Sequence, residues 1–257
     1  MEKPMKIGIL TQPLHTNYGG ILQNYALQKA LKNMGHEVWT IDRDFYVPGY
    51  RKFASIVKRM LLNLFNRNAP IRVWPNKKEE EIITQYIRAF IKSNIQSTEK
   101  ITSTKQLTRL HQKYTFDAYV VGSDQVWRPK YSPCLTNYFL DFVEDDHEII
   151  KIAYAASFGV DEWEFTQEQT KECARLAKQF HAISVREDSA IGLCKKYLGV
   201  DAVHLLDPTL LLNKEDYLSL ISNVSTTPSK GNLFVYILDK DENKTNIVNE
   251  VAKHKNL

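Results

Sequence analysis

The sequence predicts an α/β protein built on a Rossmann-like parallel sheet, and three observations carry this prediction. Short apolar runs rich in Val and Ile alternate along the chain with longer segments of helical periodicity. These runs are apolar throughout, which is typical of parallel strands that helices cover on both faces. Several runs also end abruptly at Gly, Ser, Asp or Arg, and open α/β sheets bind their ligands at the carboxyl ends of strands.

The size and composition of the chain are consistent with this fold class. Its 257 residues suit one large domain, or one complete domain and part of another. A hydrophobic fraction of 43% is enough for a substantial core. The formal net charge of +4 at pH 7 is only mildly basic, so we do not expect nucleic acid as a partner.

The cysteine pattern and the lengths of the apolar runs argue against disulfide-rich, zinc-binding, secreted and membrane-spanning proteins. Cys134, Cys173 and Cys194 are odd in number and lack CxxC or CxxH spacing, which argues against a disulfide framework and a zinc site. No other metal and no cofactor is expected. No segment resembles a signal peptide, and no apolar run reaches the roughly 18 residues of a membrane span. We therefore expect a soluble protein of the cytoplasm.

A βαβ unit opens the chain. Residues 5–10 form an apolar run, and residues 21–34 repeat apolar side chains at helical spacing up to Gly35, which suits a helix C-terminus. Residues 37–41 predict the second strand, reached by a right-handed crossover. Asp42 follows this strand, where dinucleotide-binding folds place the acid that binds ribose.

The loop between the first strand and the helix lacks a dinucleotide fingerprint. It contains Asn17-Tyr18-Gly19-Gly20 instead of GxGxxG, so a nicotinamide or flavin cofactor is not expected. These residues precede a helix, where free backbone N–H groups bind anions. The alternative is a turn whose glycines need positive φ. His15, in the same loop, is the only histidine in a candidate loop.

Residues 51–66 form a basic amphipathic segment. Their apolar residues recur at helical spacing, with Lys and Arg on both sides. The pattern predicts a helix that packs on the sheet with solvated flanks. The alternative is a helix that associates weakly with an anionic membrane surface, which would place the protein at the inner face of the membrane. Two further helices are predicted at 77–93 and 103–114.

The central strand is predicted at 116–121 and ends at a glycine. Ser123, Asp124 and Gln125 follow directly, so three polar side chains stand at the carboxyl end of a parallel strand. This favours a binding loop, with a plain polar turn as the alternative. Trp127 comes two residues later, and few turns need so large a side chain. We expect Trp127 to be buried as a wedge under the loop.

The alternation of strands and helices continues beyond this loop. We expect a long loop at 128–137, an extended segment at 138–142, strands at 151–159, 182–185 and 202–206, and helices at 166–180, 189–198 and 213–221. Ser157 lies in the small-residue turn that ends one of these strands. Asp207 and Pro208 end the last of them, and we interpret this pair as a structural turn.

Arg186 is the most suggestive single residue. It lies at a strand exit just before a helix, where a guanidinium fork and free backbone N–H groups together suit a phosphate or a carboxylate. The alternative is an arginine that is simply paired with Glu187 or Asp188.

A Ser-, Thr- and Pro-rich stretch divides the chain. We predict an N-terminal Rossmann-like domain at 1–222, a linker at 223–231, and the start of a second α/β domain at 232–257. The last part carries a predicted strand at 232–238 and a helix at 242–253. One such unit cannot bury both faces of its own sheet, so we expect this second domain to be incomplete and the chain alone to lack activity.

Five blocks of sequence follow one another in a specific order. They are Asn17–Gly20, Gly122–Trp127, Ala156–Gly159, Ser184–Ser189 and Asp207–Leu211. Together they resemble the polysaccharide pyruvyl transferase family, and the resemblance covers almost the whole chain. It implies two Rossmann-like domains in a GT-B-like arrangement. It also implies transfer of pyruvate from phosphoenolpyruvate to a sugar of a cell-surface glycan, usually as a cyclic ketal.

The resemblance also implies a division of roles. Arg186, with Ser157, would bind phosphoenolpyruvate. The acceptor, a glycan or a lipid-linked saccharide, would meet residues that bind it or shape the cleft: Asn17, Tyr18, Gly19, Gly20, Ser123, Asp124, Gln125 and Trp127. The family's acid is implied to lie in the second domain, and His15 is the one candidate within this chain.

Two other functions fit the same residues. One is a GT-B-type glycosyltransferase that uses a nucleotide sugar, which would need base recognition from the second domain. The other is a non-catalytic relative that binds glycans. Stabilisation by phosphoenolpyruvate, by a nucleotide sugar or by neither would separate the three. The sequence does not predict the oligomeric state.

Overall fold

The computed structural model describes residues 3–46, 48, 50, 57, 77–144, 146–222, 232–239 and 241–255. The chain divides into two compact units, residues 1–213 and 214–257. This division falls earlier than the linker predicted at 223–231, which lies outside the described residues, as does nearly all of the basic segment at 51–66.

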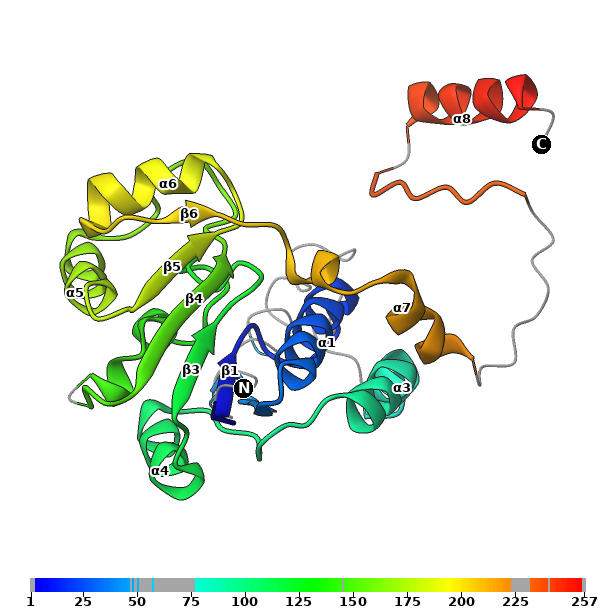
Figure 1. Cartoon of the computed structure of the whole chain (residues 1–257). Helices are drawn as coiled ribbons and strands as arrows, with labels where there is room; N and C mark the ends of the chain where they lie inside the picture. Colours follow the sequence, from blue (N-terminus) through cyan, green and yellow to red (C-terminus); the bar gives the residue numbers. More distant parts are fainter. Residues whose placement is uncertain are drawn as a thin grey trace. The chain divides into compact units, whose positions relative to one another are not determined.

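The first unit is built on a six-stranded sheet in the order β2-β1-β3-β4-β5-β6, with every neighbouring pair parallel. Figure 1 labels β1 and β3 to β6 of this sheet. The strands are β1 (Lys6–Leu10), β2 (Glu37–Thr40), β3 (Ala118–Val121), β4 (Ile150–Ala156), β5 (Ala182–Val185) and β6 (Val203–His204). The predicted fold class, α/β with a Rossmann-like parallel sheet, is confirmed. Ile9, Leu10, Val121 and Val185 are completely buried, which explains the continuous apolar runs.

The predicted helices within the described residues also form. In the first unit they are α1 (Tyr18–Asn33), α3 (Lys77–Asn94), α4 (Thr104–Tyr114), α5 (Gln167–Ala177) and α6 (Ser189–Leu193), which continues as a π-helix at Cys194–Leu198. The second unit contains α7 (Lys214–Ile221) and α8 (Glu242–His254). Side-chain caps explain several helix starts: Ser103 begins α4, and Thr166 forms a capping box with Gln169 at α5.

The strand order places a topological switch point beside β1. The chain passes from β1 through α1 to β2 on one side, and later adds β3 on the other side of β1. The connections after β1 and β3 therefore lead to opposite sides of the switch point. Open α/β sheets bind ligands at the carboxyl ends of the two strands that flank such a point. Both loops carry residues that the sequence marks as candidates.

Trp127 is completely buried, as predicted, and is the largest such side chain among the described residues. Its indole stacks on Phe139, with ring centroids 4.9 Å apart, and contacts Phe158 at 5.4 Å. The indole N–H donates to the carbonyl oxygen of Tyr138 at 3.0 Å, so its polar atom is also satisfied. The loop after β3 is thus anchored to the aromatic core.

The segment predicted as extended at 138–142 is instead helical. Two 3₁₀ turns form, at Leu135–Phe139 and Asp141–Val143, separated by Leu140 in the left-handed conformation with φ of 59°. Apolar residues spaced for a strand can also face one side of a tight turn. Here tertiary packing decides, because the turns bury Tyr138, Phe139 and Phe142 together.

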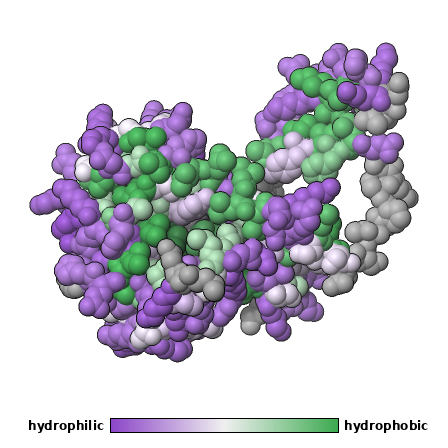
Figure 2. All heavy atoms as spheres, viewed as in Figure 1, coloured by the Kyte–Doolittle hydropathy of each residue, from purple (hydrophilic) through white to green (hydrophobic). Residues whose placement is uncertain are grey.

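The strand predicted at 202–206 is shorter and less buried than expected. Only Val203 and His204 pair with β5, and Val203 and Leu206 expose 58% and 62% of their surface. Figure 2 shows exposed apolar side chains in this part of the molecule. β6 ends the described sheet, so sequence hydrophobicity overestimated the burial of an edge strand.

The strand predicted at 232–238 is also absent: these residues are described, and they form no strand. Phe234, Tyr236 and Leu238 expose 90%, 76% and 85% of their surface. A strand needs a hydrogen-bonded neighbour, which apolar composition alone does not provide. Among the described residues, no helix is both long enough and apolar enough to span a bilayer.

Replacing Trp127 with Ala should lower the free energy of unfolding by about 3–5 kcal/mol, because it leaves a large cavity and an unpaired carbonyl at Tyr138. Trp39 is a matched control, since its ring is only partly buried. Its alanine variant should lose clearly less. Urea denaturation followed by circular dichroism measures both, and equal losses would contradict the anchoring role of Trp127.

Candidate functional site

The loop after β3 is shaped by close backbone contacts. Gly122 has φ of 122°, and a Cβ there would collide with the carbonyl oxygen of Tyr154 on β4. Ser123 is completely buried, and its hydroxyl donates to the carbonyl oxygen of Ala155 at 2.8 Å. Ser123 therefore joins the loop to β4 and is not accessible to a ligand.

Asp124 is the loop residue that reaches the start of α1. It adopts the left-handed conformation, with φ of 69°, and is 9% exposed. Its Oδ2 accepts a hydrogen bond from Asn17 Nδ2 at 3.2 Å, while Oδ1 accepts from the backbone N–H of Gln125 at 2.8 Å. The two predicted loops thus meet at this carboxylate.

The Asn17–Gly20 block proves to be the beginning of α1. Asn17 is the N-cap, and its side-chain oxygen accepts from the N–H of Gly20 at 3.1 Å. Gly19 and Gly20 are both helical, so the interpretation as a turn of positive φ is wrong. Space explains Gly20 instead: a Cβ there would lie 2.7 Å from Asp124 Oδ2. Tyr18, in contrast, is 60% exposed.

Gln125 connects the β3 loop to the loop after β4. Its Oε1 accepts from Arg128 Nη1 at 3.1 Å, and Arg128 makes a bidentate ion pair with Glu164. Gly159 has φ of 71°, and a Cβ there would collide with the Gln125 amide. Gln125 therefore holds two loops together, and its amide oxygen is already engaged.

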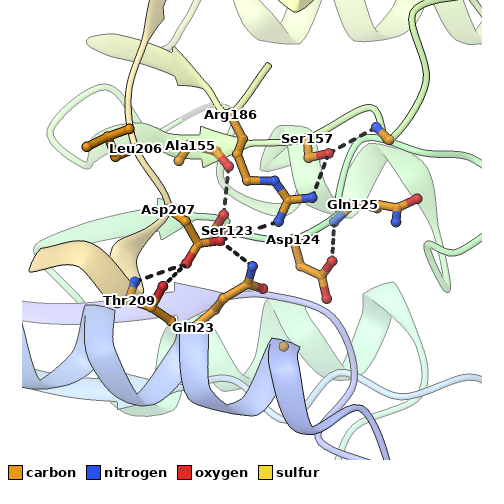
Figure 3. Close-up of polar contacts among 12 residues, drawn as sticks. Gln23, Ser123, Asp124, Gln125, Ala155, Ser157, Arg186, Leu206, Asp207 and Thr209 are labelled. Carbon is orange, nitrogen blue, oxygen red and sulfur yellow. Dashed lines mark hydrogen bonds and ion pairs between the residues drawn. The ribbon is translucent and has the colours of Figure 1, made fainter. Parts of the chain in front are cut away.

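Arg186 lies at the carboxyl end of β5, and each of its three side-chain nitrogens has a partner. Figure 3 shows the contacts with Ser157 and Asp207. Nε contacts Glu187 Oε1 at 3.3 Å, Nη2 donates to Ser157 Oγ at 3.1 Å, and Nη1 lies 3.5 Å from Asp207 Oδ2. The pairing with Glu187 was one sequence alternative. The contact with Asp207 was not predicted, and Asp188 instead caps α6. The Arg186 side chain remains 23% exposed.

Ser157 connects Asp124, on the loop after β3, with Arg186 and Glu187, which follow β5. Its backbone N–H donates to the carbonyl oxygen of Asp124 at 3.1 Å. Its hydroxyl accepts from Arg186 and donates to Glu187 Oε1 at 2.6 Å. The residue is completely buried. The predicted donor residues and the predicted acceptor loop therefore form one connected site at the carboxyl edge of β3, β4 and β5.

Gln23 and Asp207 belong to the same network, although sequence reasoning did not select them. Gln23 Nε2, on α1, donates to Asp207 Oδ2 (Figure 3). The position of Asp207 just after β6 was a usable signal, but an Asp-Pro pair is also a common turn. Nothing in the sequence indicates that Gln23 faces that turn.

His15 is exposed, and its Nδ1 lies 3.1 Å from Thr16 Oγ1. The structure records no contact between His15 and Arg186 or Ser157. The cysteines are free, and burial raises the pKa of Cys173 and Cys194 to about 12, so neither is a thiolate at neutral pH. Among the described residues, no three metal-ligating side chains gather.

Replacing Gly20 with Ala should displace Asp124 or Asn17, because the new methyl group would occupy space that the carboxylate now fills. Gly19 is a matched control: a Cβ there would meet only Asn17 Oδ1, at 3.4 Å. Gly19→Ala should be neutral or stabilising by up to about 1 kcal/mol through helix propensity. Thermal denaturation compares the melting temperatures of the two variants. A higher melting temperature for Gly20→Ala than for the unsubstituted chain would contradict the close approach of Asp124 to Gly20.

Comparisons with known proteins identify the family of this chain. A model of the polysaccharide pyruvyl transferase family matches residues 17–256. The search of curated proteins finds no match. Among solved structures, TcdA (CsdL) aligns at 13% identity over 78% of this chain and 69% of its own, with a TM-score of 0.29. The E. coli tRNA N6-threonylcarbamoyladenosine dehydratase TcdA aligns at 11% identity over 85% of this chain and 86% of its own, also with a TM-score of 0.29. We draw no inference from structural matches at this level.

The family model, in contrast, covers nearly the whole chain. The chain belongs to the polysaccharide pyruvyl transferase family.

Proposed function

We propose that this chain, together with a second domain that completes the site, transfers a pyruvyl group from phosphoenolpyruvate to a sugar of a cell-surface polysaccharide or its precursor, forming a pyruvate ketal. The family indicates polysaccharide pyruvyl transferase activity in general. The donor and the ketal product are our proposal. The acceptor is a glycan or a lipid-linked saccharide.

The geometry of Arg186 is the observation that supports the donor most directly. Phosphoenolpyruvate carries a phosphate and a carboxylate close together, and a guanidinium fork can bind either group through two parallel hydrogen bonds. Arg186 is held at the ligand-binding edge of the sheet by Ser157 and two carboxylates, and it stays partly exposed. A restrained arginine loses little freedom when an anion binds.

The reaction balances without a cofactor. The methylene carbon of phosphoenolpyruvate takes up a proton, and an acceptor hydroxyl adds to the neighbouring carbon as its double bond is lost. The C–O bond to phosphate then breaks, and a second hydroxyl closes the ketal. Two hydroxyl protons are released: one balances the new methyl proton, and the other leaves with phosphate. Arg186 would offset the negative charge of the donor throughout.

The acceptor would lie toward the start of α1. The exposed ring of Tyr18 offers an apolar face to a sugar, and Asp124 offers a carboxylate that can accept hydrogen bonds from hydroxyls. Ser157 links Asp124 to Arg186, which would bring acceptor and donor to one place. We propose that the acid comes from a second domain, with His15 as the alternative on this chain.

Replacing Arg186 with Ala should weaken the binding of phosphoenolpyruvate by about ten- to a hundredfold, because a charge-assisted contact is lost. Arg186→Lys should recover only part of the affinity, since an ammonium group lacks the planar fork. Isothermal titration calorimetry with the whole chain measures these affinities.

Arg175→Ala is the matched control for this series. Arg175 also contacts two carboxylates, Glu144 and Glu172, but Glu144 precedes β4 at the opposite edge of the sheet. Its loss should leave donor affinity unchanged. Equal donor binding by Arg186→Ala and the unsubstituted chain would remove Arg186 from the donor site.

A further inference from the structure

Asp207 divides its two carboxylate oxygens between different tasks. Oδ1 accepts from the backbone N–H of Thr209 at 3.0 Å and from the Thr209 hydroxyl at 2.7 Å, and so starts the 3₁₀ turn at Pro208–Leu211. Oδ2 accepts from Gln23 Nε2 and lies 3.5 Å from Arg186 Nη1. Capping this turn needs only one acceptor oxygen, which an asparagine would also supply. The second oxygen calls for another explanation.

The contacts of Oδ2 complete the restraint on the Arg186 guanidinium (Figure 3). Glu187 and Ser157 engage Nε and Nη2, so Asp207 is the partner of the remaining nitrogen. A guanidinium paired at all three nitrogens has its plane defined. Gln23 on α1 donates a hydrogen bond to Oδ2 and so helps to fix its position. Asn17, the N-cap of the same helix, donates to Asp124.

We infer that Asp207 is a positioning residue: it holds the Arg186 guanidinium in the plane that receives the carboxylate or phosphate of the donor. The inference rests on the proposed function, in which Arg186 binds phosphoenolpyruvate. Asp207 also places a negative charge near an anionic donor. The side chains of Arg186 and Asp207 are both about a quarter exposed, so water screens the repulsion between Asp207 and the donor. The orientation of the guanidinium, in contrast, determines the geometry of its direct hydrogen bonds to the donor. Positioning should therefore dominate.

Asp207→Asn separates the two tasks. Both Thr209 donors keep the amide oxygen at the Oδ1 position, so the NH₂ group replaces Oδ2 and cannot pair with Arg186 Nη1. Gln23 can accept this NH₂ through its Oε1, which is buried and accepts no hydrogen bond within the described part of the chain. The variant should keep its melting temperature and release only Arg186.

The expected result is a dissociation constant for phosphoenolpyruvate about tenfold higher in Asp207→Asn, measured by calorimetry on the whole chain. In an Arg186→Ala background the same change should add nothing, because Asp207 acts through Arg186. Thr209→Val is the matched control, since it weakens the turn but leaves Oδ2 in place. It should not alter donor affinity.

A donor-independent measurement accompanies the titration. Phenylglyoxal labelling of Arg186, followed by mass spectrometry, should be faster in Asp207→Asn than in the unsubstituted chain or Thr209→Val. Equal labelling, unchanged donor affinity or additive losses in the double variant would each overturn the positioning role. If the unsubstituted chain does not bind phosphoenolpyruvate, the proposed donor fails, and the labelling still decides whether Asp207 restrains Arg186.

Discussion

The hydrogen bonds of Ser157 are the contacts on which the site depends. A completely buried serine uses its backbone N–H for Asp124 on one side, and its hydroxyl for Arg186 and Glu187 on the other. Each bond alone contributes about 1 kcal/mol, but a buried polar group left without its partner costs more. The three loops after β3, β4 and β5 therefore hold one another in register.

The charges around Arg186 bear on how an anion could bind at this site. One guanidinium contacts Glu187 and Asp207, so the ligand-free cluster carries more negative than positive charge. The proposed anionic donor would therefore gain most from direct, oriented contact with the guanidinium fork rather than from a broad positive field. A second cationic group from outside this cluster would strengthen such binding, which agrees with the proposal that a second domain completes the site.

Glycines control how closely the loops approach. Gly20 leaves room for the Asp124 carboxylate, Gly122 for the backbone of β4, and Gly159 for the Gln125 amide. Two of the three also have positive φ, whereas Gly20 is helical and is required for space alone. These glycines explain why the sequence blocks combine small residues with polar ones. The small residues permit contacts through which the polar ones are oriented.

The sequence by itself determined the fold class, most element positions and the burial of Trp127, because these follow from local periodicity and from the size of one side chain. It also located Arg186, Ser157 and Asp124 at strand exits. Only the tertiary structure decided which of them touch, since partners such as Asp207 and Gln23 lie 184 residues apart along the chain. It likewise decided that 138–142 is helical and that 232–238 is not a strand, because core packing and strand pairing depend on distant residues.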